Sequence, residues 1–183
     1  MPFKSRHTDD LLKGRTSIPG AVYFLTWVTH RRSPFFADNL NRNLTRKHLA
    51  AIDESGDGSI MSGNVMPDHI HLLLELGSRL PLSAVVAKTK AAITRACRDV
   101  KWQLNYFDHQ LRATEHAEDY AFYIFMNPYC AEICPLNQTW AGWVPSRTVR
   151  WRFEEKLRSG SLPQPEWLEQ ASRFGANLPD GAD

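Results

Sequence analysis

Two histidines separated by one residue, His69 and His71, are the first group in the sequence whose types and spacing suggest chemistry. Residues two apart in a β-strand project from the same face, so a strand here would present both imidazoles to one point. The leucines that follow, residues 72–74, indicate a strand buried on both faces. Buried imidazoles need partners, and a metal ion would satisfy both at once. The alternative is a pair of structural histidines held by hydrogen bonds, because this spacing occurs in many unrelated proteins.

A second polar group falls within residues 115–127, where apolar periodicity predicts a helix. Successive helix residues turn by about 100°, which places the polar side chains in one stripe on an otherwise apolar helix. The stripe contains His116, Tyr120, Tyr123 and Asn127. Tyr123 and Asn127 lie one turn apart and could contact one ligand together. The alternatives are tyrosines packed in the core and an Asn-Pro pair that only ends the helix.

Strands and helices must position these groups, and the sequence predicts them in alternation. Predicted strands cover residues 21–29, 59–66, 69–76 and 106–112, and predicted helices cover 38–54, 81–100 and 115–127. Asp38 is the predicted N-cap of the first helix, and Met66-Pro67-Asp68 predicts the tight turn of an antiparallel hairpin. This order predicts an α+β fold with helices packed on an antiparallel sheet, and a ferredoxin-like core is the simplest topology.

The alternating elements predict one globular domain over residues 1–145. Residues 146–183 form a C-terminal extension that is poorly defined by its sequence, because prolines, glycines and tryptophans are scattered around and through it. Short helices at about 148–158 and 165–174 are predicted there.

Composition and charge restrict the class of protein. The apolar content of 43% is sufficient for one core in a chain of 183 residues, and no apolar run is long enough to span a membrane. A cytoplasmic protein without a membrane partner is therefore expected. The net charge of +2 is modest, but bases outnumber acids between Arg79 and Lys101. That stretch indicates a helix facing a polyanion, or else an ordinary solvated helix face.

Several motifs, taken in order along the chain, resemble the HUH tyrosine transposases, especially the REP-associated branch. They are the strand Val22–Thr29, MPDHIHL at 66–72, WQ at 102–103, FDHQLR at 107–112 and Tyr123-Ile124 followed by Asn127-Pro128. The resemblance covers residues from about 20 to about 145. It implies the α+β fold of the HUH endonucleases and makes residues 1–145 an HUH transposase-like catalytic domain.

The resemblance also implies the roles of individual residues. His69 and His71 would bind a divalent metal, Mg²⁺ or Mn²⁺, and Asn127 would complete the metal site. Tyr123 would be the nucleophile. The implied activity is transposase-like nicking and joining of single-stranded DNA, at hairpins or short repeats, through a 5′-phosphotyrosine intermediate.

Basic side chains are the predicted contacts to the phosphate backbone of a DNA partner. They are Arg31, Arg32, Lys88, Lys90, Arg95 and Arg112. His109, on the strand before the last core helix, is a supporting candidate that could orient a neighbour or transfer a proton. Hydrogen bonding within the core is the alternative for His109.

Two other functions fit the same residues. One is a metal-dependent hydrolase that uses the His-x-His pair to activate water, with Tyr123 only structural. The other is a noncatalytic or domesticated nucleic-acid-binding module. The sequence leaves open which DNA sequence is recognised, whether the protein is a monomer or a homodimer, and whether it still mobilises DNA.

Overall fold

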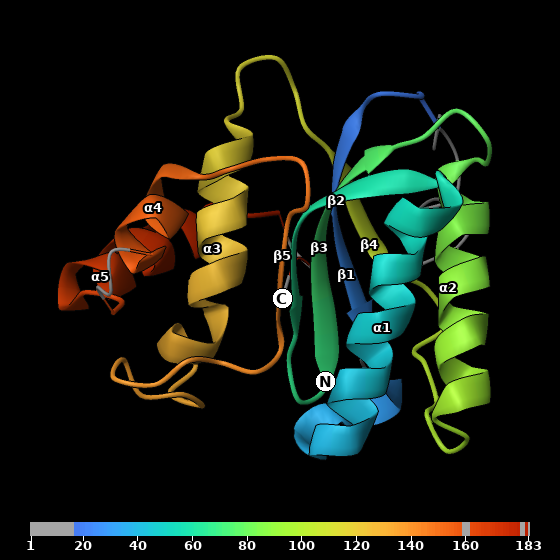
Figure 1. Ribbon diagram of the computed structural model, residues 1–183, viewed down its shortest axis with the longest axis horizontal. Coiled ribbons are helices and arrows are strands. Elements are labelled where there is room, and N and C mark those ends of the chain that lie inside the picture. Colours follow the sequence, from blue (N-terminus) through green and yellow to red (C-terminus); the bar gives the residue numbers. More distant parts are fainter. Residues whose placement is uncertain (1–16, 159–161, 180–181, 183) are drawn as a thin grey trace, which may run out of the picture.

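A computed structural model describes residues 17–158, 162–179 and 182 of the chain. Its elements are β1 (Val22–Val28), η1 (His30–Arg32), η2 (Phe35–Ala37), α1 (Asn39–Ser55), β2 (Gly58–Val65), β3 (His69–Leu76), α2 (Leu82–Ala96), β4 (Phe107–Gln110), α3 (Ala117–Cys130), β5 (Trp143–Pro145), α4 (Arg152–Arg158) and α5 (Pro165–Gly175). The strands form one five-stranded antiparallel sheet in the order β4-β1-β3-β2-β5 (Figure 1). The first four strands have the order of a ferredoxin-like unit, so the predicted α+β class is confirmed.

The sheet separates two hydrophobic cores. Helices α1 and α2 cover one face, and α3, α4 and α5 lie on the other side of the sheet (Figure 1). Strand β3 contributes to both cores, because Leu72 and Leu74 pack toward α1 and α2 whereas Leu73 packs toward α3. The run of leucines after the histidines therefore belongs to a strand buried on both faces, as predicted.

Local sequence signals explain most element ends. The Asp38 side chain accepts a hydrogen bond from the Asn41 amide at 2.9 Å and caps α1, as predicted. Gly56 ends the same helix with a φ of 69°, which glycine adopts without steric cost. The Met66 amide donates to the His69 carbonyl at 2.9 Å and closes the predicted hairpin between β2 and β3.

Some predicted bounds were wrong. Helix α2 ends at Ala96 instead of residue 100, β4 covers only residues 107–110, and β5 was not predicted. Helix α3 continues through Pro128 to Cys130, although a proline ordinarily stops a helix because it lacks an N–H group. The missing hydrogen bond is replaced from the sheet, as described below.

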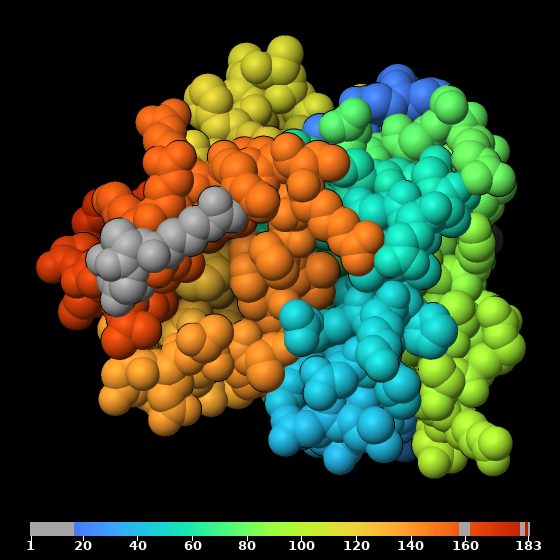
Figure 2. Space-filling model, in the orientation of Figure 1, coloured from blue at the N-terminus to red at the C-terminus, as the bar shows by residue number. Residues whose placement is uncertain are grey.

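The segment after β5 packs on the outer side of α3. Trp167 of α5 meets Phe122 of α3 with ring centroids 5.4 Å apart, and Phe153 of α4 meets Phe122 at 5.5 Å. Figure 2 shows the segment around β5, in orange, filling the surface between α1 and the C-terminal helices. Among the described residues, no helix combines the length and apolar character needed to cross a bilayer.

Candidate active site between the sheet and helix α3

His69 and His71 project from β3 toward α3, and their Nε2 atoms lie 3.0 Å apart. His71 is completely buried, and His69 is 8% exposed. Burial, and secondarily the neighbouring His69, holds the pKa of His71 well below its usual value. His71 is therefore neutral near pH 7, which is the form of imidazole that binds metals.

The Nδ1 atoms of both imidazole rings are held by hydrogen bonds. Nδ1 of His69 lies 2.6 Å from the Asp68 carboxylate, which can only accept. Nδ1 of His71 lies 3.0 Å from the Thr26 hydroxyl, and that hydroxyl donates its own hydrogen to the Ala182 carbonyl. Thr26 must then accept from His71. Both imidazoles carry a hydrogen on Nδ1, which leaves the Nε2 lone pairs available to a metal.

The two imidazoles fit a divalent cation. Neighbouring ligands at about 2.1 Å from an octahedral ion are about 3.0 Å apart, and the Nε2 atoms are separated by 3.0 Å. Within residues 17–158, 162–179 and 182, no three or more His, Cys, Asp and Glu side chains gather around one metal position. The further ligand implied by the family resemblance is the amide oxygen of Asn127, whose Nδ2 donates to the Tyr123 hydroxyl.

The Asp68 carboxylate is expected to control metal affinity through His69. Asp68→Asn keeps the shape but removes the charge that holds the Nδ1 hydrogen, so Mn²⁺ affinity should fall about 10- to 100-fold. Calorimetric titration with Mn²⁺ measures this change, and Asp99→Asn, at an exposed position on the far side of the sheet, is the matched control. Equal affinities of Asp68→Asn and wild type would show that Asp68 does not support the metal site.

Tyr123 lies beside the histidine pair, on α3. Its ring centroid is 5.8 Å from that of His71, and its hydroxyl accepts a hydrogen bond from Nδ2 of Asn127 at 3.2 Å. Helix α5 approaches the other side of the ring so closely that a Cβ added to Gly175 would lie 2.8 Å from Cε2 of Tyr123. The phenol is thus held between the sheet and α5, with Asn127 at its oxygen.

Tyr120, the other phenol in the predicted stripe, is engaged elsewhere. Its hydroxyl donates to Glu115 at 2.8 Å. Burial and the Glu115 carboxylate raise the pKa of Tyr120 well above its usual value. A phenol that must lose its proton beside a carboxylate is a poor nucleophile, so the geometry favours Tyr123. His116 lies outside the helix, at the exposed N-cap position of α3.

His109 belongs to the same network as Tyr120. Its Nε2 lies 2.9 Å from a Glu115 oxygen, and its ring stacks on Tyr120 with centroids 6.0 Å apart. Strand β4 is separated from β3 by β1, so His109 is on the same face as His71 but not adjacent to it. This placement favours the core hydrogen-bonding role for His109.

The predicted DNA contacts fall into separate groups. Arg31 and Arg32 are exposed in the turn after β1, and Arg32 donates to Asp68 at 3.2 Å, directly beside His69. Both arginines have left-handed backbone conformations, with φ of 55° and 50°, which are uncommon for residues other than glycine. The structure thus brings Arg32 to the candidate metal site.

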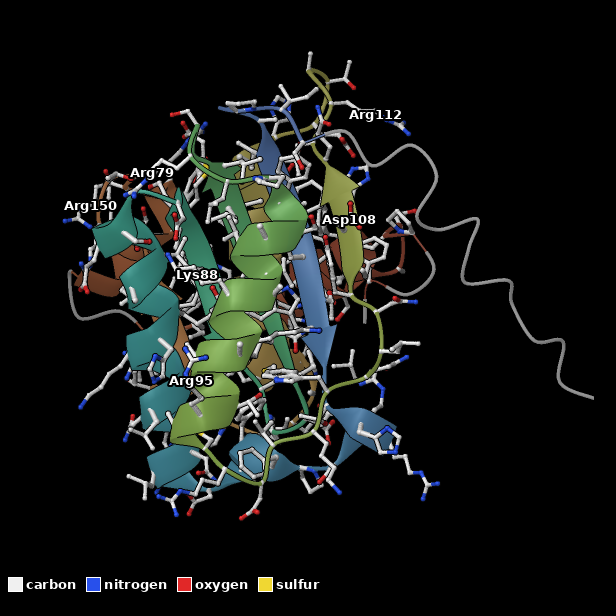
Figure 3. All side chains as sticks on the ribbon, turned by 90° about the vertical axis from the view of Figure 1, so that its right-hand side faces the viewer. Arg79, Lys88, Arg95, Asp108, Arg112 and Arg150 are labelled. Atoms are coloured by element: carbon white, nitrogen blue, oxygen red, sulfur yellow. The ribbon has the colours of Figure 1, made fainter. Side chains whose placement is uncertain are left out.

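The predicted contacts on α2 lie across the sheet from the histidines. Lys88 pairs with Asp57, and Arg95 is exposed. Lys90 packs 5.2 Å from the centre of the Trp102 ring, and burial lowers its pKa to about 8. Figure 3 shows Lys88 and Arg95 on this helical face and Arg112 beyond the end of β4. Arg112 follows the strand end near Val22, whereas His69 pairs with Val28 at the opposite end of β1.

Sequence reasoning missed the polar neighbours of the histidines. Thr26 in β1 and Asn64 in β2 are the direct cross-strand partners of His71, so a row of polar side chains crosses three strands. Asp68 was assigned only to the turn. A polar residue within an otherwise apolar strand was the available signal for Thr26, and a carboxylate adjacent to a metal-binding histidine was the signal for Asp68.

Comparisons with known proteins agree with this arrangement. A family model of IS200-like transposases matches residues 17–107, a segment that includes both histidines and ends before α3. The fold is similar to that of a REP-associated tyrosine transposase solved in complex with a REP hairpin, with a TM-score of 0.62 and 22% sequence identity, covering 81% of this chain and 86% of that chain. A candidate transposase from Deinococcus radiodurans R1 has a TM-score of 0.46 at 22% identity, covering 55% of this chain and 86% of that one. No curated protein sequence matches the chain significantly.

The matched segment contains β3, the strand that carries the histidine pair, and the shared fold extends beyond it. The five-stranded sheet with helices on both faces is therefore similar in fold to that REP-associated transposase. Residues 17–107 therefore belong to the family of IS200-like transposases.

Proposed function

We propose that this chain is a metal-dependent endonuclease and strand transferase for single-stranded DNA, with Tyr123 as its nucleophile. The observation that carries the proposal is that the Tyr123 ring lies beside His71, whose Nε2 faces that of His69, whereas Tyr120 is bound by Glu115. Membership in a transposase family supports a DNA-processing reaction. The likeness to a transposase that binds a REP hairpin supports hairpin DNA as the substrate.

The reaction is a transesterification at phosphorus. The Tyr123 oxygen attacks the scissile phosphate and the bond from phosphorus to the 3′ oxygen breaks. The phenolic proton leaves for solvent, and the departing 3′ oxygen takes a proton from solvent. DNA remains joined through a 5′-phosphotyrosine, and a 3′-hydroxyl is released. When that hydroxyl or another attacks the phosphotyrosine, a phosphodiester forms again and the tyrosine is restored. One phosphoester bond replaces another, so no nucleotide cofactor is needed.

Residues of this chain prepare the attack in distinct ways. A free phenol has a pKa of about 10 and is mostly protonated at neutral pH, so its position matters. Asn127 holds the Tyr123 oxygen by a hydrogen bond, and Phe24, 6.2 Å away between ring centroids, packs edge-on against the ring. His69, His71 and the Asn127 amide oxygen would hold Mg²⁺ or Mn²⁺, which when bound polarises the scissile phosphate.

Formation of a covalent adduct tests the proposal. Wild-type protein incubated with end-labelled hairpin DNA and Mn²⁺ should yield a labelled band that migrates with the protein on a denaturing gel. Cleaved DNA without protein attached would instead favour the hydrolase that activates water. Binding without cleavage would favour the noncatalytic module.

The placement of the arginines predicts where DNA crosses the molecule. Arg31→Gln should weaken hairpin binding and reduce the slope of log affinity against log salt by about one, because one phosphate contact is lost. Arg95→Gln makes the same change on the opposite face of the sheet and should leave the slope unchanged. Fluorescence anisotropy across a salt series, with hairpin and random duplex as probes, measures both, and the wild type should prefer the hairpin.

A larger loss of hairpin affinity in Arg95→Gln than in Arg31→Gln would contradict this path. It would place the DNA along α2 instead, where the basic stretch of the sequence lies. Equal affinity for hairpin and duplex at every salt concentration would contradict the proposed substrate.

A further inference from the structure

Helix α3 has an interruption at Pro128. In an α-helix the amide of residue 128 would donate to the carbonyl of Ile124, but proline has no amide hydrogen. A buried carbonyl without a partner is costly. The Ile124 carbonyl instead accepts a hydrogen bond from Nδ2 of Asn64 in β2, at 2.7 Å. A side chain of the sheet thus supplies the bond that the helix cannot make.

Asn64 is fixed at both ends of its amide. The side chain is fully buried, and its Oδ1 accepts from Nε1 of Trp140 at 2.7 Å. These two bonds assign the amide orientation, because an indole nitrogen only donates and a carbonyl only accepts. Trp140 is itself covered by the Arg42 guanidinium, 4.8 Å from the ring centre. Asn64 therefore has little freedom to turn away from Ile124.

The position of Asn64 connects both halves of the candidate site. In the sheet it stands directly opposite His71, and directly paired residues of antiparallel strands project from the same face. On the helix side it contacts Ile124, the residue that follows Tyr123. The strand that neighbours the histidines and the turn that contains the phenol are joined through one side chain.

A second contact from β2 to α3 provides a comparison. The Ser62 hydroxyl donates to the Ala121 carbonyl at 3.3 Å, one helical turn before Ile124. The partner of Ala121 within the helix is the amide of Phe125, which is an ordinary donor. The Ser62 bond adds to an intact helix bond, whereas the Asn64 bond replaces a missing one.

We propose that Asn64 is a positioning residue of the active site, which holds the Tyr123 to Asn127 turn of α3 against His71 by replacing the hydrogen bond that Pro128 cannot donate. This inference rests on the proposed function of Tyr123. Without the bond, the Ile124 carbonyl must turn toward another donor, and the turn that carries the phenol shifts with it. Displacements of about 1 Å are sufficient to slow a positioned reaction by up to about 100-fold.

A double-mutant cycle isolates this role. The four proteins are wild type, Asn64→Leu, Pro128→Ala and the double variant. Asn64→Leu removes the donor at similar volume, and Pro128→Ala gives the helix its own amide hydrogen for Ile124. Single-turnover adduct formation with hairpin DNA is measured for each, together with the urea midpoint of unfolding and the Mn²⁺ affinity.

Asn64→Leu is expected to slow adduct formation about 10- to 100-fold in the Pro128 chain and much less in the Pro128→Ala chain. Mn²⁺ affinity should fall much less than the rate, because both histidine ligands stay in place and only the Asn127 end of the site moves. The urea midpoint should fall less in the Pro128→Ala background, because the alanine amide then supplies the hydrogen bond to Ile124. Ser62→Ala is the matched control and should change the rate little.

Equal slowing by Asn64→Leu in both backgrounds would overturn the inference, and so would an unchanged rate in the Pro128 chain. If Asn64→Leu fails to fold, Asn64→Ala, which removes the donor with a smaller side chain, takes its place in the cycle. The urea midpoints separate the two proposals, since they measure the bond between Asn64 and Ile124 without any reaction. If the wild type forms no adduct, the proposed function of Tyr123 is refuted. If the effects of the two substitutions on the urea midpoint are still non-additive, Asn64 supports the structure of α3 but not the reaction.

Discussion

Replacement of Tyr123 by phenylalanine is expected to abolish the covalent adduct with DNA while leaving the fold and metal binding intact. The change removes one oxygen, whose described hydrogen bond comes from Asn127. Loss of that bond should lower the free energy of unfolding by about 1.5 kcal/mol or less. The reaction, in contrast, loses its nucleophile, so adduct should fall below detection on a denaturing gel with end-labelled hairpin DNA.

Tyr120→Phe is the matched control on the same helix. Its hydroxyl is bound to Glu115, so this variant should lose some stability but still form the adduct. An adduct that persists in Tyr123→Phe and disappears in Tyr120→Phe would overturn the assignment of the nucleophile. Cleavage by Tyr123→Phe at the wild-type rate, without adduct, would favour the hydrolase.

The second large effect is expected from His69→Ala combined with His71→Ala. These side chains supply two nitrogens that face each other at 3.0 Å, so the double variant should show no saturable Mn²⁺ binding under conditions that saturate wild type. Adduct formation should be lost with it. Because His71 is completely buried, the cavity left behind should also reduce stability, by about 2–5 kcal/mol.

His109→Ala separates the loss of metal from the loss of fold. His109 lies on the same face of the sheet and is also partly buried, but its partner is Glu115. Its removal should cost stability and preserve Mn²⁺ binding. Calorimetry at a temperature where circular dichroism shows every variant folded provides the comparison. Identical Mn²⁺ binding by wild type and the double histidine variant would show that the site is misassigned.

Local periodicity in the sequence was sufficient to predict several structural features of this protein. The two-residue repeat of a strand places His69 and His71 on one face, and the helical repeat places Tyr123 and Asn127 one turn apart. The Asp38 cap and the turn before His69 depend on neighbouring residues and were also predicted. Such features need only short segments of chain, and their physical causes act within a few residues.

Strand register and helix packing decided what periodicity could not. Both tyrosines of the stripe lie on the predicted face of α3. Only the packed structure shows that Tyr123 lies beside His71 and that Tyr120 donates its hydrogen bond to Glu115. The sheet likewise separates the basic side chains of α2 from the histidines, because α2 packs on the face opposite α3. The sequence alone does not show on which face of the sheet each helix packs. A repeat shows which residues share a face, but not which faces meet.

Pro128 shows the same limit for a single residue. The rule that proline ends a helix depends on a missing donor, and within the sequence nothing replaces it. In the folded chain, Asn64 is 64 positions before Pro128 and still provides that donor, so α3 continues to Cys130. Hydrogen-bond partners so distant in sequence are brought together by the register of β2 with β3 and the packing of α3 on the sheet. Only the tertiary structure determines that contact.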